Sequence, residues 1–227
     1  MFTVLGGKIW LEEGPVNYRP SEDSLWLAGL LPDDIPAECM ICDAGCGSGA
    51  VGLSYLAKRN KKASLYGFDS NPQMITAAKK SAEANKSKAH FEVGDISAPP
   101  FGEEEFALVF ANPPFYRPTR EMVSELSALA EVKFSPTPLE DWLESMIKLA
   151  ANGSYIGLIA HKKDQASLMN EGSQQGAGCV KAYSLQSAPG KGAKRTVLIF
   201  KKGAEAQKVV EETIRTYDPE TRDLFLT

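Results

Sequence analysis

The heptapeptide Asp-Ala-Gly-Cys-Gly-Ser-Gly, residues 43–49, decides the fold of this chain of 227 residues. It follows a short apolar run at residues 39–42 and precedes an amphipathic run at 51–59, so we expect it to turn the chain from a strand into a helix. Its three glycines remove side chains at a sharp turn, which lets backbone N–H groups approach a ligand closely. The sequence therefore predicts an α/β fold with a ligand-binding turn near its start.

Strand and helix patterns alternate after this turn. Strands are predicted over residues 39–42, 63–68, 89–93, 106–111, 154–160, 178–185 and 196–201. Helices are predicted over residues 51–59, 72–85, 139–151, 164–174 and 205–216. Before the turn, the sequence predicts a small strand near 9–11 and a helix from Ser21 to Pro32. This alternation predicts a doubly wound, Rossmann-like sheet of seven strands, mostly parallel with an antiparallel C-terminal strand.

Composition favours one globular domain. Hydrophobic residues make up 43% of the chain and charged residues 24%, which is ordinary for a folded domain. We divide it into an N-terminal extension (1–37), a cofactor-binding sheet (38–202) and a C-terminal tail (203–227). The sequence has no apolar run of about 18 residues and no secretory pattern, and its cysteines do not form a disulfide framework. We therefore expect a cytoplasmic protein, with a monomer favoured.

Carboxylates follow three successive predicted strands: Asp43, Asp69 and Asp95. The glycine spacing is G-x-G-x-G rather than the G-x-G-x-x-G that cradles a dinucleotide diphosphate. Asp69 is placed to accept hydrogen bonds from ribose hydroxyls, and Asp95 from an adenine amino group. The pattern predicts an adenosine-type ligand without a diphosphate, with Asp43 facing its other end.

The string Asn112-Pro113-Pro114-Phe115 follows the fourth predicted strand. The Asn112 side-chain oxygen and the Pro113 carbonyl oxygen can accept the two hydrogens of a planar amino group, so that its lone pair develops toward an electrophile. The prolines restrict the backbone and so aim these acceptors in advance. Phe115 offers a flat face for stacking a base. The string predicts a reaction at a planar nitrogen, with no titrating general base.

These segments together resemble the class I S-adenosylmethionine-dependent methyltransferases over about residues 40–159. The resemblance implies S-adenosyl-L-methionine as the cofactor, held by Asp43, Gly45, Gly47, Gly49, Asp69, Asp95 and Asn112. The Asn-Pro-Pro-Phe string is similar to the motif shared by adenine-N6 and glutamine-amide methyltransferases. It implies that Asn112, Pro113 and Phe115 perform the catalysis.

The flanking segments resemble the bacterial tRNA-valine adenine-N6 methyltransferases. The similar segments are residues 18–25, 139–143 and 189–195, although Ser21-Glu22-Asp23 stands where that family often has Gly-x-Asp. The resemblance implies methylation of the N6 amino group of an adenine in tRNA. The implied substrate contacts are Tyr18, Arg19, Asp23, Phe115, Tyr116, Arg117, Lys191, Lys194 and Arg195.

Charge along the chain is asymmetric. Residues 161–202 hold eight Lys and Arg against two Asp and Glu, a balance of +6, whereas the whole chain carries −4. A local basic face suits phosphates, and a solvated lysine-rich surface is an equal alternative.

Two other functions stay open. One is a glutamine-amide N5 methyltransferase that acts on a protein such as a release factor; such enzymes usually carry an N-terminal helical domain, for which the residues before Asp43 are too few. The other is a non-catalytic RNA-binding module on a methyltransferase scaffold. We expect no metal site, because Cys39, Cys42 and Cys46 lack a second ligand pair.

Overall fold

The computed structural model describes residues 1–59, 62–114, 137–205 and 209–226. The elements of the N-terminal half are β1 (Phe2–Val4), β2 (Ile9–Leu11), the 3-10 turn η1 (Pro15–Asn17), α1 (Glu22–Leu30), β3 (Met40–Ala44), α2 (Ala50–Arg59), β4 (Ser64–Asp69), α3 (Pro72–Ala84), β5 (His90–Val93) and β6 (Phe106–Ala111). Those of the C-terminal half are α5 (Leu139–Leu149), β7 (Ala150–His161), η3 (Lys162–Asp164), α6 (Gln165–Gln174), β8 (Ala177–Gln186), β9 (Arg195–Lys202), β10 (Val210–Arg215) and α7 (Pro219–Leu226).

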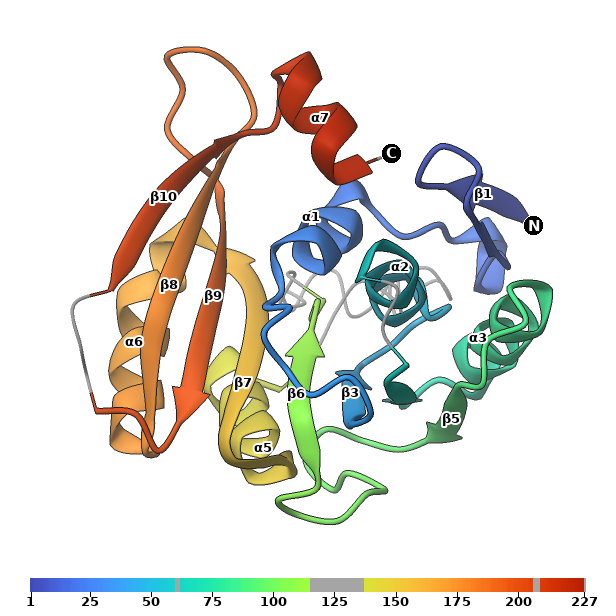
Figure 1. The fold of residues 1–227 in the computed structure, drawn as a ribbon, viewed down its shortest axis with the longest axis horizontal. Coiled ribbons are helices and arrows are strands. Elements are labelled where there is room, and N and C mark those ends of the chain that lie inside the picture. The colour runs from blue at the N-terminus through green and yellow to red at the C-terminus, as the bar shows by residue number, and fades with distance from the viewer. Residues whose placement is uncertain (60–61, 115–136, 206–208, 227) are drawn as a thin grey trace, which may run out of the picture.

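One large sheet organises the molecule (Figure 1). Its strands lie in the order β10-β8-β9-β7-β6-β3-β4-β5. Every neighbouring pair is parallel except those made by β9, which runs antiparallel to β7 and to β8. The predicted doubly wound α/β class, with an antiparallel strand near the C-terminus, is confirmed.

Helices cover both faces of the sheet because its central strands are apolar on both sides. Along β6, Leu108 and Phe110 pack with α1, α2 and α3, whereas Val109 packs with α5 and α6. In Figure 1, α1 and α2 accordingly lie on the near side of the sheet and α5 and α6 on the far side. The buried strands thus separate two apolar cores and bring the ends of β3, β4, β5 and β6 to one edge.

The end of one strand at the site differs from the predicted one. Strand β3 extends to Ala44 rather than ending at residue 42, so Asp43 is a strand residue and not part of the turn. It pairs with Gly67 of β4 and Phe110 of β6 and is fully buried. An aspartate is unfavourable in a strand interior, which is why the sequence placed the turn too early.

The C-terminal region was predicted wrongly. The expected helix over 205–216 is strand β10 in residues 210–215, which adds an eighth strand beside β8 and pairs Ile214 with Leu185. Helix α7 follows and packs its Phe225 ring 5.4 Å from the Trp26 ring of α1. Residues 209–226 are therefore part of the fold rather than a tail.

Candidate active site

The glycine turn between β3 and α2 has the backbone that its sequence demands. Gly45, Gly47 and Gly49 have φ values of +67°, +53° and +83°, a region that other residues enter only at a cost. A Cβ on Gly45 would lie 2.6 Å from the Trp142 ring, whereas a Cβ on Gly47 would have no described atom within 4 Å. Gly45 is thus required by packing, and Gly47 leaves an open surface at the edge of the sheet.

Asp69 at the end of β4 holds this turn in place. Its Oδ2 accepts a hydrogen bond from the Gly47 N–H at 3.0 Å, and its Oδ1 accepts one from the Asn71 N–H at 2.9 Å. Burial raises the pKa of Asp69, while the two N–H donors act in the opposite direction. Each carboxylate oxygen keeps a lone pair for a further donor, as the predicted contact with ribose hydroxyls requires.

Asp43 lies beneath the turn. Its Oδ2 accepts a hydrogen bond from the Gly52 N–H of α2 at 3.0 Å, and its Oδ1 is buried with no hydrogen-bond partner among the described residues. Burial raises its pKa to about 8, and the nearby Asp69 charge adds to the rise. The Asp43 Oδ1 is therefore a buried acceptor that can still take a hydrogen bond. The raised pKa also means that the carboxyl binds a proton, or a positively charged group, more readily than an exposed aspartate does.

Asp95 lies in the loop after β5 and is exposed. Its Oδ1 accepts hydrogen bonds from the Ser97 N–H at 2.9 Å and the Ser97 hydroxyl at 2.6 Å, which lower its pKa. Two residues earlier, Val93 is 53% exposed and pairs with Asp69 across β4 and β5. The sequence analysis missed Val93, because an apolar residue at the end of a short strand looks like a core residue.

Asn112 follows β6 and makes one directional contact with α1. Its Nδ2 donates a hydrogen bond to the Ser24 Oγ at 2.9 Å. Its Oδ1 is buried and, within the part of the chain that the structure describes, has no partner. Buried polar atoms are rarely left unpaired, and a ligand that is absent from the structure is one explanation for such an exception. Phe115, Tyr116 and Arg117 lie outside the described residues.

The predicted substrate contacts before β3 fall at different places. Burial raises the pKa of Tyr18, and the nearby charges of Asp69 and Asp23 add to the rise. Arg19 instead forms an ion pair with Glu13 and lies over the Phe2 ring, 4.8 Å from its centre. The structure thus brings Tyr18 to the cofactor edge, while the Arg19 guanidinium is engaged by the N-terminal segment.

The predicted basic contacts after β8 also divide. Lys191 and Lys194 are exposed in the loop between β8 and β9, which lies at the same edge of the sheet as the glycine turn. Arg195 instead bonds through Nε to Asp23 Oδ2 at 3.2 Å, and its Nη1 lies 2.6 Å from the His161 Nδ1. The Arg195 side chain is only 21% exposed, and its positive charge pairs with Asp23 rather than facing solvent.

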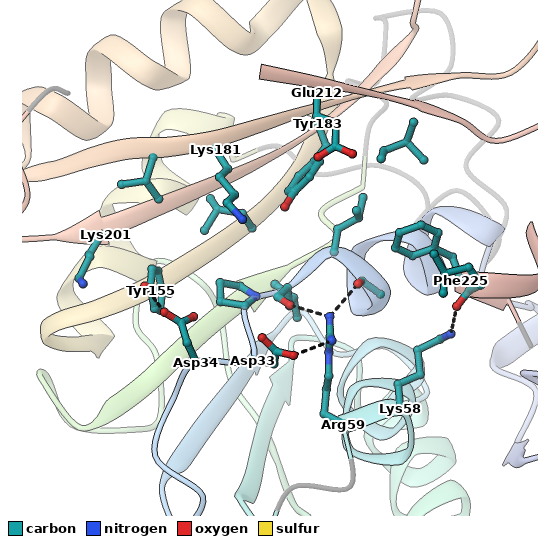
Figure 2. A pocket seen from close by; sticks show the side chains of 18 of the residues that line it. Asp33, Asp34, Lys58, Arg59, Tyr155, Lys181, Tyr183, Lys201, Glu212 and Phe225 are labelled. Carbon is teal, nitrogen blue, oxygen red and sulfur yellow. Dashed lines mark hydrogen bonds and ion pairs between the residues drawn. The ribbon is translucent and has the colours of Figure 1, made fainter. Parts of the chain in front are cut away.

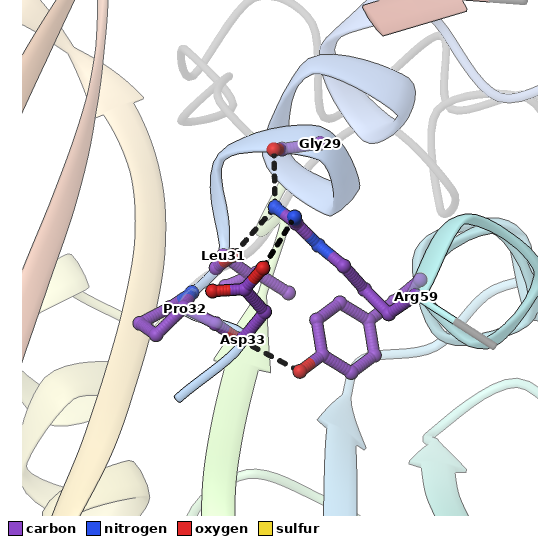
Figure 3. A network of polar contacts seen from close by, with 6 residues as sticks. Gly29, Leu31, Pro32, Asp33 and Arg59 are labelled. Atoms are coloured by element: carbon purple, nitrogen blue, oxygen red, sulfur yellow. Dashed lines mark hydrogen bonds and ion pairs between the residues drawn. The ribbon is translucent and has the colours of Figure 1, made fainter. Parts of the chain in front are cut away.

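A large groove lies elsewhere on the molecule. It has a volume of about 1400 Å³ and lies between the C-terminal end of α1 and the face of β7, β9 and β8, lined by polar residues such as Lys181, Tyr155 and Asp34 (Figure 2). No predicted site residue lines it. At its border Arg59 bonds the carbonyl oxygens of Gly29 and Leu31 (Figure 3). This network anchors the end of α1.

A family model described as a methyltransferase domain matches residues 41–132, which include the glycine turn, the three carboxylates and Asn112. That part of the chain is therefore similar to methyltransferase domains. S-adenosyl-L-methionine is the cofactor that this family implies. The match covers the cofactor side of the sheet and leaves the acceptor unspecified.

Known proteins support the methyltransferase domain at the level of fold. A magnesium-protoporphyrin O-methyltransferase of Rhodobacter capsulatus is 34% identical over 88 residues, which are 38% of this chain and 38% of that enzyme. A predicted O-methyltransferase of Agrobacterium tumefaciens superposes with a TM-score of 0.68 at 23% identity, covering 89% of this chain and 94% of that one. A putative RNA methyltransferase of Pyrococcus horikoshii gives 0.56 at 16% identity, over 86% and 89%.

The residues of the methyltransferase domain fit the implied cofactor. Gly47 leaves open space at the turn, Asp69 retains acceptor capacity, and Val93 adds exposed apolar surface beside it. The unpartnered Asp43 Oδ1 suits a ligand that carries positive charge. No group of three His, Cys, Asp or Glu side chains in the described ranges is placed to hold a metal ion, and no described helix is long and apolar enough to cross a membrane.

Proposed function

We propose that this protein methylates a planar nitrogen, the N6 amino group of an adenine in tRNA. The observation that carries the proposal is the Asn112 amide, whose nitrogen is engaged by Ser24 while its buried oxygen lacks a partner among the described residues. An acceptor in that position suits an amino group that donates hydrogens. It offers no base to a hydroxyl, which would have to lose its proton before or during attack.

The chemistry follows from where the hydrogens are held. When bound, S-adenosylmethionine supplies a methyl group on a sulfonium sulfur, which leaves as a neutral thioether with the electron pair of the broken bond. Asn112 Oδ1 and the Pro113 carbonyl oxygen accept the two amino hydrogens and so direct the nitrogen lone pair toward the methyl carbon. The methylated nitrogen then releases one hydrogen as a proton to water. Positioning in this way accounts for much of the rate in such reactions.

The positive charge of the loop between β8 and β9 supports RNA as the molecule that contains the adenine. Lys191 and Lys194 are exposed at the edge that also bears the glycine turn and Asn112. Lysines at that position suit phosphates flanking a base that is turned out of its stack. The alternative acceptor, a glutamine side-chain amide, would use the same Asn-Pro geometry. The methyl-transfer assay below distinguishes this amide from the adenine.

The test is methyl transfer from isotope-labelled S-adenosylmethionine to three acceptors: unmodified tRNA transcripts, a bacterial release factor and a catechol. We expect label in tRNA as N6-methyladenosine. The Asn112→Ala variant should lose at least about 100-fold in kcat, as is common when a transition-state hydrogen-bond partner is removed. Label in the release factor would favour the amide reaction, and label in the catechol would overturn nitrogen as the acceptor.

A further inference from the structure

We propose that Asp43 is uncharged in the free protein and releases its proton to solvent when the positively charged cofactor binds, so that it becomes the counter-charge of the cofactor. S-adenosylmethionine carries a sulfonium and an ammonium group against a single carboxylate, and so has a net positive charge. The inference rests on this cofactor and not on the identity of the methyl acceptor. It gives a role to a buried carboxyl that the transfer chemistry does not use.

The burial of Asp43 favours its uncharged form. The residue is fully buried, and its one hydrogen bond within the described part of the chain comes from the Gly52 N–H to Oδ2, at 3.0 Å. An ionised carboxylate has about four lone-pair sites for donors, so most of them would stay unfilled here. Because a buried charge without such partners is costly, the carboxyl keeps its proton to a higher pH than an exposed aspartate does.

The groups around Asp43 supply no positive charge. The negative charge of Asp69 on β4 strengthens the binding of a proton by Asp43. Burial raises the pKa of the thiols of Cys42 on β3 and Cys46 in the turn well above the usual range, so both stay uncharged. Strand β6 and the first turn of α2, which the structure describes in full, contain no charged residue. No ion pair of the described residues includes either carboxyl.

The two carboxyls lie beside the turn that we assign to the cofactor. Asp69 Oδ2 accepts the Gly47 N–H at 3.0 Å, and a Cβ on Gly47 would meet no described atom within 4 Å. A positive charge bound at this turn interacts with a buried carboxyl through a region that water and salt screen poorly. The attraction favours the ionised form of Asp43. Since burial raises its pKa to about 8, the carboxyl holds a proton at neutral pH that it can then release.

The first experiment measures the affinity for S-adenosylmethionine against pH in wild type and in Asp43→Asn. Asparagine keeps an acceptor for the Gly52 N–H and imitates the uncharged acid. A nearby opposite charge lowers the pKa of a carboxyl by about 1 or more, so by linkage the affinity of wild type should rise about tenfold or more between about pH 5 and pH 8.5. The two proteins should differ by less than about threefold at pH 5 and by about tenfold or more at pH 8.5.

The second experiment counts the protons directly. Calorimetric titration with S-adenosylmethionine in buffers of different ionisation enthalpy gives the number of protons released. At about pH 7.5, wild type should release about half a proton or more in excess of Asp43→Asn. The matched control is Asp141→Asn, which removes an exposed carboxylate on α5 and should behave as wild type does. Infrared difference spectra of wild type need no variant, and they should show that the band of a protonated carboxyl disappears when the cofactor is added.

The demethylated product separates an effect of charge from an effect of shape. S-adenosylhomocysteine lacks the sulfonium charge, so it should release fewer protons from wild type than the cofactor does. Equal release by both ligands, equal release by Asp43→Asn and wild type, or an unchanged infrared band would overturn the inference. Failure of the proposed cofactor looks different, because wild-type protein would then not bind S-adenosylmethionine at any pH.

Discussion

Replacing Gly45 and Gly47 separately by alanine should separate folding from cofactor binding within a single turn. Both residues have positive φ values, +67° and +53°, so an alanine at either position costs about 1–2 kcal/mol of backbone strain. At Gly45 the new Cβ would also lie 2.6 and 2.9 Å from two ring atoms of the buried Trp142. Overpacking of this kind costs about 1–3 kcal/mol. The Gly45→Ala variant should therefore lose about 2–5 kcal/mol of unfolding free energy in total.

At Gly47 the new methyl group meets no described atom within 4 Å and points into the space where we place the cofactor. The Gly47→Ala variant should thus lose only about 1–2 kcal/mol of stability but bind S-adenosylmethionine at least tenfold more weakly. Gly176→Ala is the matched control, because Gly176 has a φ of +76°, equal open space and a position between α6 and β8, away from the site.

Urea unfolding measures the stability of each variant, and isothermal titration calorimetry measures its affinity for S-adenosylmethionine. A second-site change should confirm the clash: Trp142→Phe should restore part of the stability lost in Gly45→Ala, because it removes ring atoms near that Cβ. The reasoning is refuted if Gly45→Ala is no less stable than Gly176→Ala, or if Gly47→Ala binds the cofactor as wild type does.

Two further predictions concern charge. Burial raises the pKa of Asp43 to about 8, so the folded state binds a proton that the unfolded chain releases at a lower pH. The contribution of this carboxyl to the free energy of unfolding is therefore fully present below about pH 4, and it declines as the pH rises to about 8, by at most about 1.4 kcal/mol per pH unit. The Asp43→Asn variant should flatten the change in urea midpoint between pH 5 and pH 8, and an unchanged slope would refute the assignment. Reversing both exposed lysines, Lys191→Glu with Lys194→Glu, should weaken tRNA binding and flatten its dependence on salt, whereas reversing the exposed Lys86 and Lys88 at the opposite edge should not; equal effects would remove this role from the loop.

Local patterns predicted the sheet well because its central strands and their glycine turn carry strong signals. The apolar run of β6 and the Asn71-Pro72 start of α3 each identify one element, and the structure places Asn71 as the predicted N-cap, accepting a hydrogen bond from the Gln73 N–H. Strand β10 was missed because an edge strand needs only one buried side chain, Ile214, and its remaining residues are polar and exposed.

The site was predicted in type but not in its connections. Asp69 ends one strand and Asn112 follows another, so their place at one edge of the sheet could be deduced from the sequence. Their partners could not, because the Gly47 N–H lies 22 residues from Asp69 and the Ser24 hydroxyl lies 88 residues from Asn112. Arg195 likewise looked like a phosphate ligand, and only the fold showed its ion pair with Asp23.

Mass spectrometry of nucleosides tests the central claim most directly. Unmodified tRNA transcripts are incubated with the protein and S-adenosylmethionine that carries a trideuterated methyl group, then digested to nucleosides. The account predicts trideuterated N6-methyladenosine with wild-type protein and none above background with Asn112→Ala. Label found on a base oxygen, on a ribose hydroxyl or on carbon, with the N6 position unlabelled, would contradict it.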